Sequence, residues 1–320
     1  MLKVDNVSKL YRVGAFGEKT LRAVHKVSFD IQKGEVVSLI GESGSGKTTI
    51  GRMVLRLLPI SSGAIWFNDM NVATLKGQAL KEYYRKVQGV FQDPFSTFNP
   101  IFKADRVFRL VKEEFFPTIS SGEWQNKVEQ ALDAVGLNPG QVLNKFPHQL
   151  SGGQLQRFLI ARALLLDIEL LVADEIISML DASTRIDVLN LLGELKKTGL
   201  SILFVTHDLS LGYYISDKAV ILYKGHVVEQ GSTDRIFGNP LHPYTQMLMA
   251  SVPRLDAKWE EELPPANGQE NGADAGLTGC VYYGRCPVAD LSLGCAQRQP
   301  DLQEIAPDHK VACFHYPGLE

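Results

Sequence analysis

Cysteine is scarce in this sequence, long apolar runs are absent and neither sign of charge dominates. The 320 residues are 45% hydrophobic and 22% charged, with a net charge of −3. Without a long basic run, the composition gives no support to nucleic-acid binding as the main role. No segment approaches the roughly 20 uncharged apolar residues that span a bilayer, and the first residues lack the apolar region of a signal peptide. We therefore expect a cytosolic chain of one large domain or two, unless it docks onto another component.

The few cysteines all lie near the end of the chain, at Cys280, Cys286, Cys295 and Cys313. Their spacing, C-x5-C-x8-C-x17-C, fits neither paired C-x2-C zinc knuckles nor a secreted disulfide framework. Four thiolates can nevertheless close one tetrahedral or cubane metal site. His309 and His315 are substitute ligands on residue type, although four cysteines need no help. An iron–sulfur cluster, zinc and unligated or disulfide-bonded cysteines are the alternatives.

The most informative motif is a G-x-x-x-x-G-K-[ST] loop that follows an apolar run at 36–40. Its glycines allow the backbone to curl into a ring of N–H donors around phosphate. A helix expected from Lys47 to near Pro59 presents its positive end to the same anion, while Lys47 reaches the outer phosphates and Thr48 ligates Mg²⁺. The motif therefore predicts a nucleoside triphosphate site. Its predicted binding residues are Gly41, Glu42, Ser43, Gly44, Ser45, Gly46, Lys47, Thr48 and Thr49.

The hydrophobic pattern predicts an α/β fold. Residues 2–7 and 27–31 alternate apolar and polar side chains, as half-buried strands of a small antiparallel sheet do. Continuous apolar runs, typical of strands covered on both faces, occur at 36–40, 170–173 and 202–205. Helical segments such as 182–196 separate these runs, and this alternation predicts a parallel core sheet.

Composition and periodicity suggest three consecutive parts. Residues 1–253 form a nucleotide-binding domain, into which a helical subdomain is inserted at about 93–157. Residues 254–279 are rich in Pro, Gly, Asn and Ala and are expected to be a linker. Residues 280–320 form the four-cysteine module. Two short strands at 220–223 and 226–230 flank Lys224-Gly225 as a hairpin.

Two adjacent carboxylates, Asp174 and Glu175, follow the apolar run at 170–173. In open α/β sheets ligands bind outside the carboxyl ends of the strands, so these side chains are expected beside the phosphate loop. Asp174 suits Mg²⁺ coordination, and Glu175 suits polarising the attacking water. Adjacent carboxylates on a surface loop are usually only solvated, but the end of an apolar strand favours the functional interpretation.

With Leu150-Ser151-Gly152-Gly153-Gln154, these motifs resemble the ABC-type ATPases over nearly the whole chain. The resemblance implies a P-loop NTPase in which two such domains meet head to tail. Each ATP then lies between the Lys47 loop of one subunit and the Ser151 loop of the other. Gln92 is similar to the glutamine of the family's Q-loop, the loop 178–181 with Asp181 to its D-loop, and His207 to its switch histidine.

The resemblance also implies roles for these residues. Thr48, Gln92 and Asp174 hold Mg²⁺, Glu175 orients or deprotonates water, and His207 contacts the γ-phosphate. The signature residues Ser151, Gly152, Gly153 and Gln154 cap the partner's ATP. Tyr11 is a candidate for stacking on adenine, although a strand aromatic is commonly only part of the core. The chain departs from the family at Ile176-Ile177, where a proline usually restricts the loop, so the D-loop conformation and the coupling between ATP sites are in question.

Two longer segments, 238–245 and 91–100, resemble segments of the ATP-binding subunits of oligopeptide and dipeptide permeases. Such subunits carry a similar four-cysteine tail, which implies a [4Fe–4S] cluster rather than zinc. The implied partners are a second ABC ATPase, either a second copy or, as the safer expectation, a paralogue, together with two membrane permease subunits and an extracytoplasmic solute-binding protein. The chain is then expected to be peripheral on the cytoplasmic face of the membrane, and no nucleic acid is expected. Peptides, nickel and oligosaccharides remain open as solutes.

Two other functions compete with this interpretation. A soluble ABC ATPase acting on nucleic acid or ribosomes would be expected to show a basic patch or a coiled-coil insertion, and the sequence shows neither. A non-catalytic regulatory cassette conflicts with the presence of Lys47, Glu175 and His207.

Overall fold

The computed structural model describes residues 1–13, 19–251 and 278–316. The chain forms two compact units. Unit 1 comprises Met1–Ile31, Val36–Ala73 and Val205–Glu320, and unit 2 comprises Gln32–Glu35 and Thr74–Phe204. The predicted linker at 254–279 lies outside the described residues except for its last two positions. The predicted domain boundaries therefore stay predictions.

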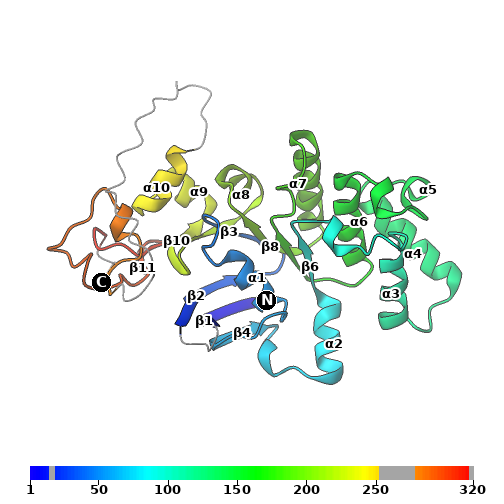
Figure 1. Ribbon diagram of the computed structural model, residues 1–320, viewed down its shortest axis with the longest axis horizontal. Coiled ribbons are helices and arrows are strands. Elements are labelled where there is room, and N and C mark those ends of the chain that lie inside the picture. The colour runs from blue at the N-terminus through cyan, green and yellow to red at the C-terminus, as the bar shows by residue number, and fades with distance from the viewer. Residues whose placement is uncertain (14–18, 252–277, 317–320) are drawn as a thin grey trace. The chain divides into compact units, whose positions relative to one another are not determined.

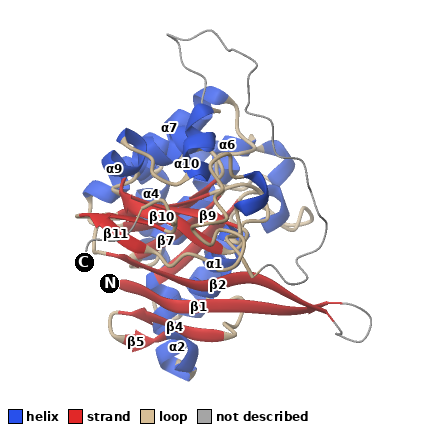
Figure 2. Ribbon diagram, turned by 90° about the vertical axis from the view of Figure 1, so that its left-hand side faces the viewer, coloured by secondary structure: helices blue, strands red, loops and turns tan. Residues whose placement is uncertain are grey.

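Unit 1 contains the predicted antiparallel sheet, with strand order β2-β1-β4-β5 (Figure 2). Its strands are β1 (Leu2–Val13), β2 (Lys19–Ile31), β4 (Ser62–Phe67) and β5 (Met70–Asn71). β1 and β2 are longer than their alternating patterns predicted. The register of the ladder shifts beside Asn6 and Lys26, both left-handed at φ 47°, and pairing resumes beyond them.

A second group of strands in unit 1 has the order β11-β12-β10-β9-β3. β3 (Val36–Ile40) is wholly buried and pairs in parallel with β9 (Lys218–Tyr223), while β10 (His226–Ser232), β12 (His309–Val311) and β11 (Gln303–Ala306) continue antiparallel. The predicted hairpin is confirmed, since Lys224 and Gly225 both have the positive φ of a tight turn. The helices of this unit are α1 (Lys47–Val54), α8 (Leu209–Ile215), α9 (Thr233–Gly238) and α10 (Pro243–Ala250).

Unit 2 combines three strands, in the order β8-β7-β6, with most of the helices (Figure 1). β6 (Val87–Phe91) and β7 (Leu170–Asp174) are parallel, as predicted for the core, and β8 is Ser201–Thr206. Helices α3 to α6 fall in or overlap the predicted helical region, and Phe158 of α6 stacks on Phe108 of α3 with ring centroids 4.3 Å apart. The helices are α2 (Gly77–Lys86), α3 (Arg106–Phe115), α4 (Ser121–Ala134), α5 (Pro139–Val142), α6 (Gly152–Leu164) and α7 (Ala182–Lys197).

Helix α1 begins at Lys47 as predicted but ends at Val54, well before Pro59. The cause is Arg56, whose left-handed backbone (φ 55°) turns the chain back on the helix. The N–H groups of Leu57 and Leu58 then donate to the carbonyl of Arg52, which satisfies one of the last helical acceptors.

Membrane-spanning helices are not found in the part of the chain that the structure describes, since none of its helices is both long and apolar enough to cross a bilayer.

A buried polar cluster joins β10, β12 and the start of α10. The Glu229 carboxylate accepts hydrogen bonds from the N–H groups of Leu241 (2.8 Å) and His242 (2.9 Å) and contacts His309 Nε2 at 2.7 Å. His242 is the N-cap of α10, and its Nδ1 accepts a hydrogen bond from the N–H of Tyr244 at 3.0 Å. Burial lowers the pKa of His242 from 6.5 to about 3. The ring therefore caps the helix in its neutral form.

The neutral cap predicts an acid-sensitive fold. Between pH 6.5 and about 3 the unfolded His242 binds a proton that the native ring does not, so stability falls as pH drops through this window. The loss contributed by this group is at most about 1.4 kcal/mol per pH unit. His242→Asn keeps an N-cap acceptor that does not titrate and should flatten this part of the profile. Chemical unfolding of both proteins across the window measures the difference, and parallel profiles would contradict the assignment.

Candidate functional site

The predicted site residues are distributed over both units. Unit 1 holds Tyr11, the loop 41–49, His207 and the four cysteines, whereas unit 2 holds Gln92, the segment 151–154, Asp174, Glu175 and Asp181. Within each unit, neighbouring strand ends and helix starts carry the predicted side chains.

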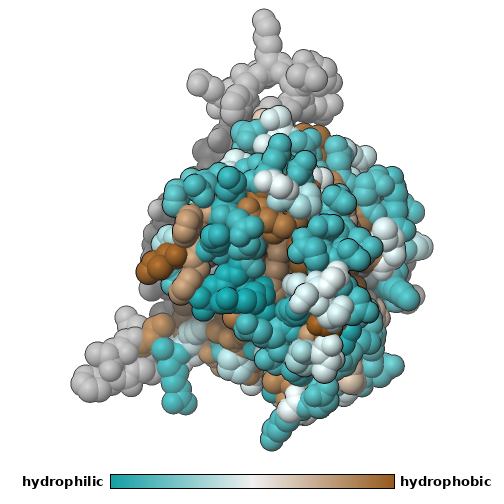
Figure 3. All heavy atoms as spheres, turned by 90° about the vertical axis from the view of Figure 1, so that its right-hand side faces the viewer, coloured by the Kyte–Doolittle hydropathy of each residue, from teal (hydrophilic) through white to brown (hydrophobic). Residues whose placement is uncertain are grey.

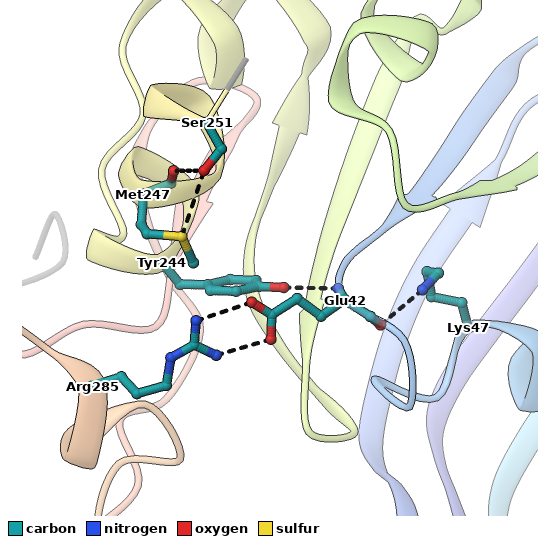
Figure 4. A network of polar contacts seen from close by, with 6 residues as sticks. All are labelled: Glu42, Lys47, Tyr244, Met247, Ser251 and Arg285. Carbon is teal, nitrogen blue, oxygen red and sulfur yellow. Dashed lines mark hydrogen bonds and ion pairs between the residues drawn. The ribbon is translucent and has the colours of Figure 1, made fainter. Parts of the chain in front are cut away.

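The phosphate loop of unit 1 is closed around its own lysine. Lys47 is only 4% exposed, and its Nζ donates to the carbonyl oxygens of Gly41 (2.7 Å) and Glu42 (2.9 Å; Figure 4). Helix α1 starts from Gly46 without a side-chain cap for its first N–H groups. The N–H groups of a helix start beside a buried ammonium group are the donor set that an anion such as a triphosphate requires. The residues present therefore fit a phosphate ligand.

One side of the loop is packed against backbone and the other is open. A Cβ on Gly41 would collide with the carbonyl of Leu222, and one on Gly46 would lie 2.6 Å from the carbonyl oxygen of Ala23. A Cβ on Gly44 would meet nothing within 4 Å, and Ser43 beside it is exposed. The glycines thus allow close packing at the back of the loop and leave the other side accessible.

The β9–β10 hairpin supports the loop from behind. The Gly225 N–H donates to the carbonyl of Ser45 at 3.0 Å, and the Gly225 carbonyl accepts from the N–H of His25 at 2.8 Å. The sequence predicted the hairpin correctly but not its contact with the phosphate loop. The Lys224-Gly225 turn is the local sequence feature that pointed toward this contact. The turn joins the phosphate loop to β2 in one backbone hydrogen-bond chain.

Tyr11 and His207 are the other predicted site residues of unit 1. Tyr11 lies half-buried on β1 opposite Leu21, and Lys9 Nζ is 5.1 Å from its ring centroid. His207 is exposed and follows β8. The next residue, Asp208, caps α8 by accepting from the N–H groups of Ser210 and Leu211, so His207 sits directly before a fixed helix start. A stacking role for Tyr11 stays a prediction.

In unit 2 the two carboxylates lie at the end of β7, beside the end of the paired strand β6. Phe91 is the register partner of Asp174 in the parallel β6–β7 pair, so Gln92 and Glu175 leave neighbouring strand ends. Asp174 is 5% exposed, whereas Gln92 is exposed. Glu175 has a left-handed backbone with φ 51°. Such backbone strain at a non-glycine residue is concentrated at functional sites.

The loop after Glu175 is fixed by hydrogen bonds and by apolar burial. The Glu175 carbonyl accepts from both the N–H (3.1 Å) and the hydroxyl (2.8 Å) of Ser178. Ile176 and Ile177 are 1% and 2% exposed. Apolar burial therefore fixes the loop at the position where the resemblance led us to expect a proline.

Asp181 closes the D-loop as the N-cap of α7. Its carboxylate accepts from Ser183 Oγ (2.6 Å) and from the N–H of Thr184 (3.0 Å), and these hydrogen bonds hold its pKa well below the usual range. Arg185 donates back to the carbonyls of Leu180 and Ser178. The segment from Ser178 to Asp181 is thus held at both ends.

The signature segment begins α6. Ser151 and Gln154 form a capping box, in which the Gln154 N–H donates to Ser151 Oγ (3.1 Å) and the Ser151 N–H donates to Gln154 Oε1 (2.9 Å). Gly153 packs on Thr184 so closely that a Cβ would collide with its methyl group, and a Cβ on Gly152 would touch Leu180. Unit 2 therefore places the signature segment beside the D-loop.

The four cysteines converge on one narrow cavity in unit 1. Cys295 is buried, and Cys280 and Cys286 pack against a core cluster that contains Tyr282 and Tyr244. Burial raises the pKa of Cys280 to about 11 and also raises the pKa values of Cys286 and Cys313. The described residues contain no preformed group of three or more His, Cys, Asp or Glu side chains that could hold a metal ion. The metal cluster stays a prediction.

The two substitute ligands have other contacts. His309 is 2% exposed and bonds to Glu229, while His315 Nε2 donates to the carbonyl of Val288 at 2.6 Å. His315 lines the cysteine cavity, together with the four cysteines.

Two family descriptions match the chain: ABC transporter at residues 24–178, and oligopeptide/dipeptide transporter, C-terminal region, at residues 228–292. The chain is 40% identical to the oligopeptide transport ATP-binding protein AppF of Bacillus subtilis, covering 99% of this chain and 97% of that protein. It is 39% identical to a putative peptide import ATP-binding protein of Brucella ovis, covering 98% and 97%.

Solved structures of ATP-binding cassettes are similar as well. The dimeric, post-hydrolysis cassette MJ0796 bound to ADP and Pi has a TM-score of 0.65 and 29% identity, covering 73% of this chain and 99% of that one. CbiO1 of Clostridium perfringens, part of the transporter complex cbiONQ, has a TM-score of 0.64 and 26% identity, covering 74% and 90%.

The packing of the phosphate loop predicts unequal costs for two alanine substitutions. Gly44→Ala meets only the strain of a left-handed backbone, on the order of 1–2 kcal/mol, because φ is +79° and the space is open. Gly46→Ala adds a collision with the Ala23 carbonyl to a similar strain at φ +101°. We expect Gly46→Ala to lower the free energy of unfolding by at least about 1 kcal/mol more than Gly44→Ala. Denaturant titration without nucleotide measures both, and equal losses would contradict the packing argument.

Proposed function

Because this chain belongs to the ABC transporter family, whose ATP-binding subunits couple ATP hydrolysis to transport, we propose that it powers the import of oligopeptides or dipeptides. The observation that carries this proposal is the pairing of two family matches on one chain, the transporter ATPase at 24–178 and the oligopeptide/dipeptide C-terminal region at 228–292. The relatives named for peptide import and oligopeptide transport support the same solute class. Nickel and oligosaccharides become alternatives that a transport assay distinguishes.

Each predicted site residue has a role in this proposal. Lys47 and the N–H groups at the start of α1 hold the phosphates, and Thr48, Gln92 and Asp174 hold Mg²⁺. Bound Mg²⁺ neutralises charge that develops on the phosphoryl oxygens. Glu175 orients or deprotonates the attacking water, His207 contacts the γ-phosphate and Tyr11 stacks on adenine. Positioning and charge stabilisation, rather than covalent chemistry, then supply most of the catalysis.

The exposed signature segment suggests a second copy or paralogue as partner. Ser151 is exposed and Gly152 is half-buried at the start of α6, and Asp181 lies on the neighbouring D-loop. In a head-to-tail pair, the positive end of α6 in one subunit faces the ATP held by the Lys47 loop of the other. ATP binding then closes the pair, and hydrolysis opens it.

The remaining partners are two permease subunits and an extracytoplasmic solute-binding protein, with this chain peripheral on the cytoplasmic face of the membrane. The segment after Gln92 is suited to the permease contact, because it exposes Phe95 (49%), Ile101 (77%) and Phe102 (40%). Figure 3 views the molecule from the right-hand side of Figure 1 and shows apolar patches within a largely hydrophilic face. Exposed apolar groups of this kind are typical of protein interfaces.

We also propose the predicted organisation: a nucleotide-binding domain at 1–253 with its helical insertion at about 93–157, a linker at 254–279 and a module at 280–320. In that module, Cys280, Cys286, Cys295 and Cys313 hold a [4Fe–4S] cluster. All four line one cavity, which supports a shared ligand, and binding would draw the thiols together and deprotonate them. Equal amounts of iron and labile sulfide in anaerobically purified protein would support the cluster. Zinc without labile sulfide would show that the four cysteines hold zinc instead.

Two capping boxes offer a matched test of the ATPase mechanism. Ser151→Ala removes the cap of α6, and Ser120→Ala removes the same kind of cap from α4, where the Glu123 N–H donates to Ser120 Oγ. Both should cost about 0.5–2 kcal/mol of stability. Only Ser151→Ala should also lower ATP hydrolysis and labelled-peptide uptake by the assembled importer, on the order of tenfold to a hundredfold.

The outcomes separate the parts of the proposal. Equal losses of activity in both variants, or full activity of Ser151→Ala, would refute the role of the signature segment. ATP hydrolysis that responds to nickel or an oligosaccharide but not to peptides would change the solute class. Nucleic acid or ribosomal proteins in place of permeases among the co-purifying components would favour the soluble alternative.

A further inference from the structure

The cysteine module, residues 280–316 of the described chain, contacts the phosphate loop directly. Arg285, which precedes Cys286, donates from Nη1 to Glu42 Oε2 at 2.9 Å and from Nη2 to Glu42 Oε1 at 3.0 Å (Figure 4). Glu42 is the second residue of the phosphate loop. The two side chains are 42% and 41% exposed, so solvent screens their attraction. The fork-to-fork geometry therefore contributes orientation more than energy.

The backbone of Glu42 is held as well. Its N–H donates to the Tyr244 hydroxyl of α10 at 2.9 Å, and its carbonyl accepts from Lys47 Nζ at 2.9 Å. Side chain, N–H and carbonyl of one residue thus contact the cysteine module, α10 and the phosphate-binding lysine (Figure 4). A change in the direction of the Glu42 side chain would therefore shift the Glu42 carbonyl, which orients Lys47.

Arg285 is aimed by a short turn between two cysteines. The 3-10 helix Tyr283–Arg285 is closed by hydrogen bonds from the Tyr283 N–H to the Cys280 carbonyl and from the Cys286 N–H to the Tyr283 carbonyl. The arrangement of Cys280 and Cys286 therefore fixes the position of the guanidinium group.

The same turn is anchored in the core of unit 1. Tyr282 is 2% exposed and packs edge-on against Tyr223, with ring centroids 5.1 Å apart and planes at 89°. Its ring centroid is also 5.5 Å from that of Tyr244, and the Arg285 guanidinium lies 5.8 Å from the centroids of Tyr223 and Tyr282. Aromatic packing and cation–π contact leave the guanidinium little freedom to follow a displaced loop.

We propose that Arg285 is a positioning residue of the ATP site, which holds the phosphate loop through Glu42 and so couples the four-cysteine module to nucleotide affinity. The inference rests on the proposed ATPase function and adds that the cysteine module controls the affinity for nucleotide. Coupling between two sites is reciprocal. Ordering of the module therefore raises the affinity for MgATP, and MgATP stabilises the module by the same factor.

Charge gives Arg285 a second effect on the site. The Glu42 carboxylate belongs to the loop that receives a triphosphate, and Arg285 neutralises it. Without Arg285, an unpaired carboxylate would face the incoming anion. Removal of Arg285 should therefore weaken MgATP binding more when Glu42 keeps its charge than when Glu42 is replaced by glutamine.

Nucleotide binding to the assembled importer tests the coupling. In Arg285→Ala we expect the Kd for MgATP to rise about tenfold, within the range of typical coupling energies, and KM to rise with little change in kcat. Arg285→Lys, which keeps the charge but loses the fork, should show a smaller rise. In a Glu42→Gln background, Arg285→Ala should add less than about twofold. Arg298→Ala is the matched control, since Arg298 belongs to the same module but packs over Phe314.

A second readout comes from the module itself. MgATP should slow backbone hydrogen exchange at residues 280–286 in the wild type and in Arg298→Ala, and this protection should be largely lost in Arg285→Ala. Wild-type affinity and protection in Arg285→Ala would overturn the inference while the ATPase proposal stands. Additive effects of the Glu42 and Arg285 substitutions would also overturn it. An importer that hydrolyses no ATP even in its wild-type form would instead refute the proposed function.

Discussion

The nucleotide end of unit 1 depends on the burial of the Lys47 ammonium group against carbonyl oxygens of its own loop. A buried cation is costly unless hydrogen bonds satisfy it. The loop must therefore curl until the carbonyls of Gly41 and Glu42 point inward, and this curl requires the backbone of the β9–β10 hairpin to approach it without an intervening side chain. Lysine, glycines and hairpin thus form one arrangement, which holds the N–H groups at the start of α1 in one orientation. Donors held in a fixed orientation are the condition for strong electrostatic stabilisation of a developing anion.

The elements that the sequence predicted well are those whose evidence is local. A strand buried on both faces appears as a nearly continuous apolar run. Val36–Ile40, interrupted only by Ser38, was therefore predicted to the residue, and the predicted end of β7 was one residue short. The strands β11 and β12 have no such signal, because both are short. β12 pairs with β10 some 80 residues away in sequence, as the separation of Glu229 and His309 shows, and β11 pairs with β12. The early end of α1 was also out of reach, since nothing about an arginine predicts a left-handed backbone at Arg56.

The candidate site shows the same division. Motifs at Gly41–Thr48, Ser151–Gln154 and Asp174–Glu175 identify residue types whose chemistry is evident from spacing alone. The contacts that hold those residues do not follow from spacing. Glu42 and Arg285 are 243 positions apart, and each is unremarkable in its own neighbourhood. Their pairing arises because Tyr282 inserts into the core beside Tyr223 and Tyr244 and brings the turn after Cys280 to the loop. A one-dimensional pattern records the chemistry of a site but not the supports that position it.

The buried pair Ile176 and Ile177 holds the loop after Glu175 by a different physical means from the proline expected there. A proline restricts the backbone through its ring, and this restriction is nearly independent of temperature. Apolar burial is driven by the solvent and weakens on cooling. The segment between Glu175 and Asp181 is therefore held most firmly in warmth and loosens in the cold. In the head-to-tail pair that we propose, communication between the two nucleotide sites through this segment would have a thermal dependence that a proline-restricted loop would lack.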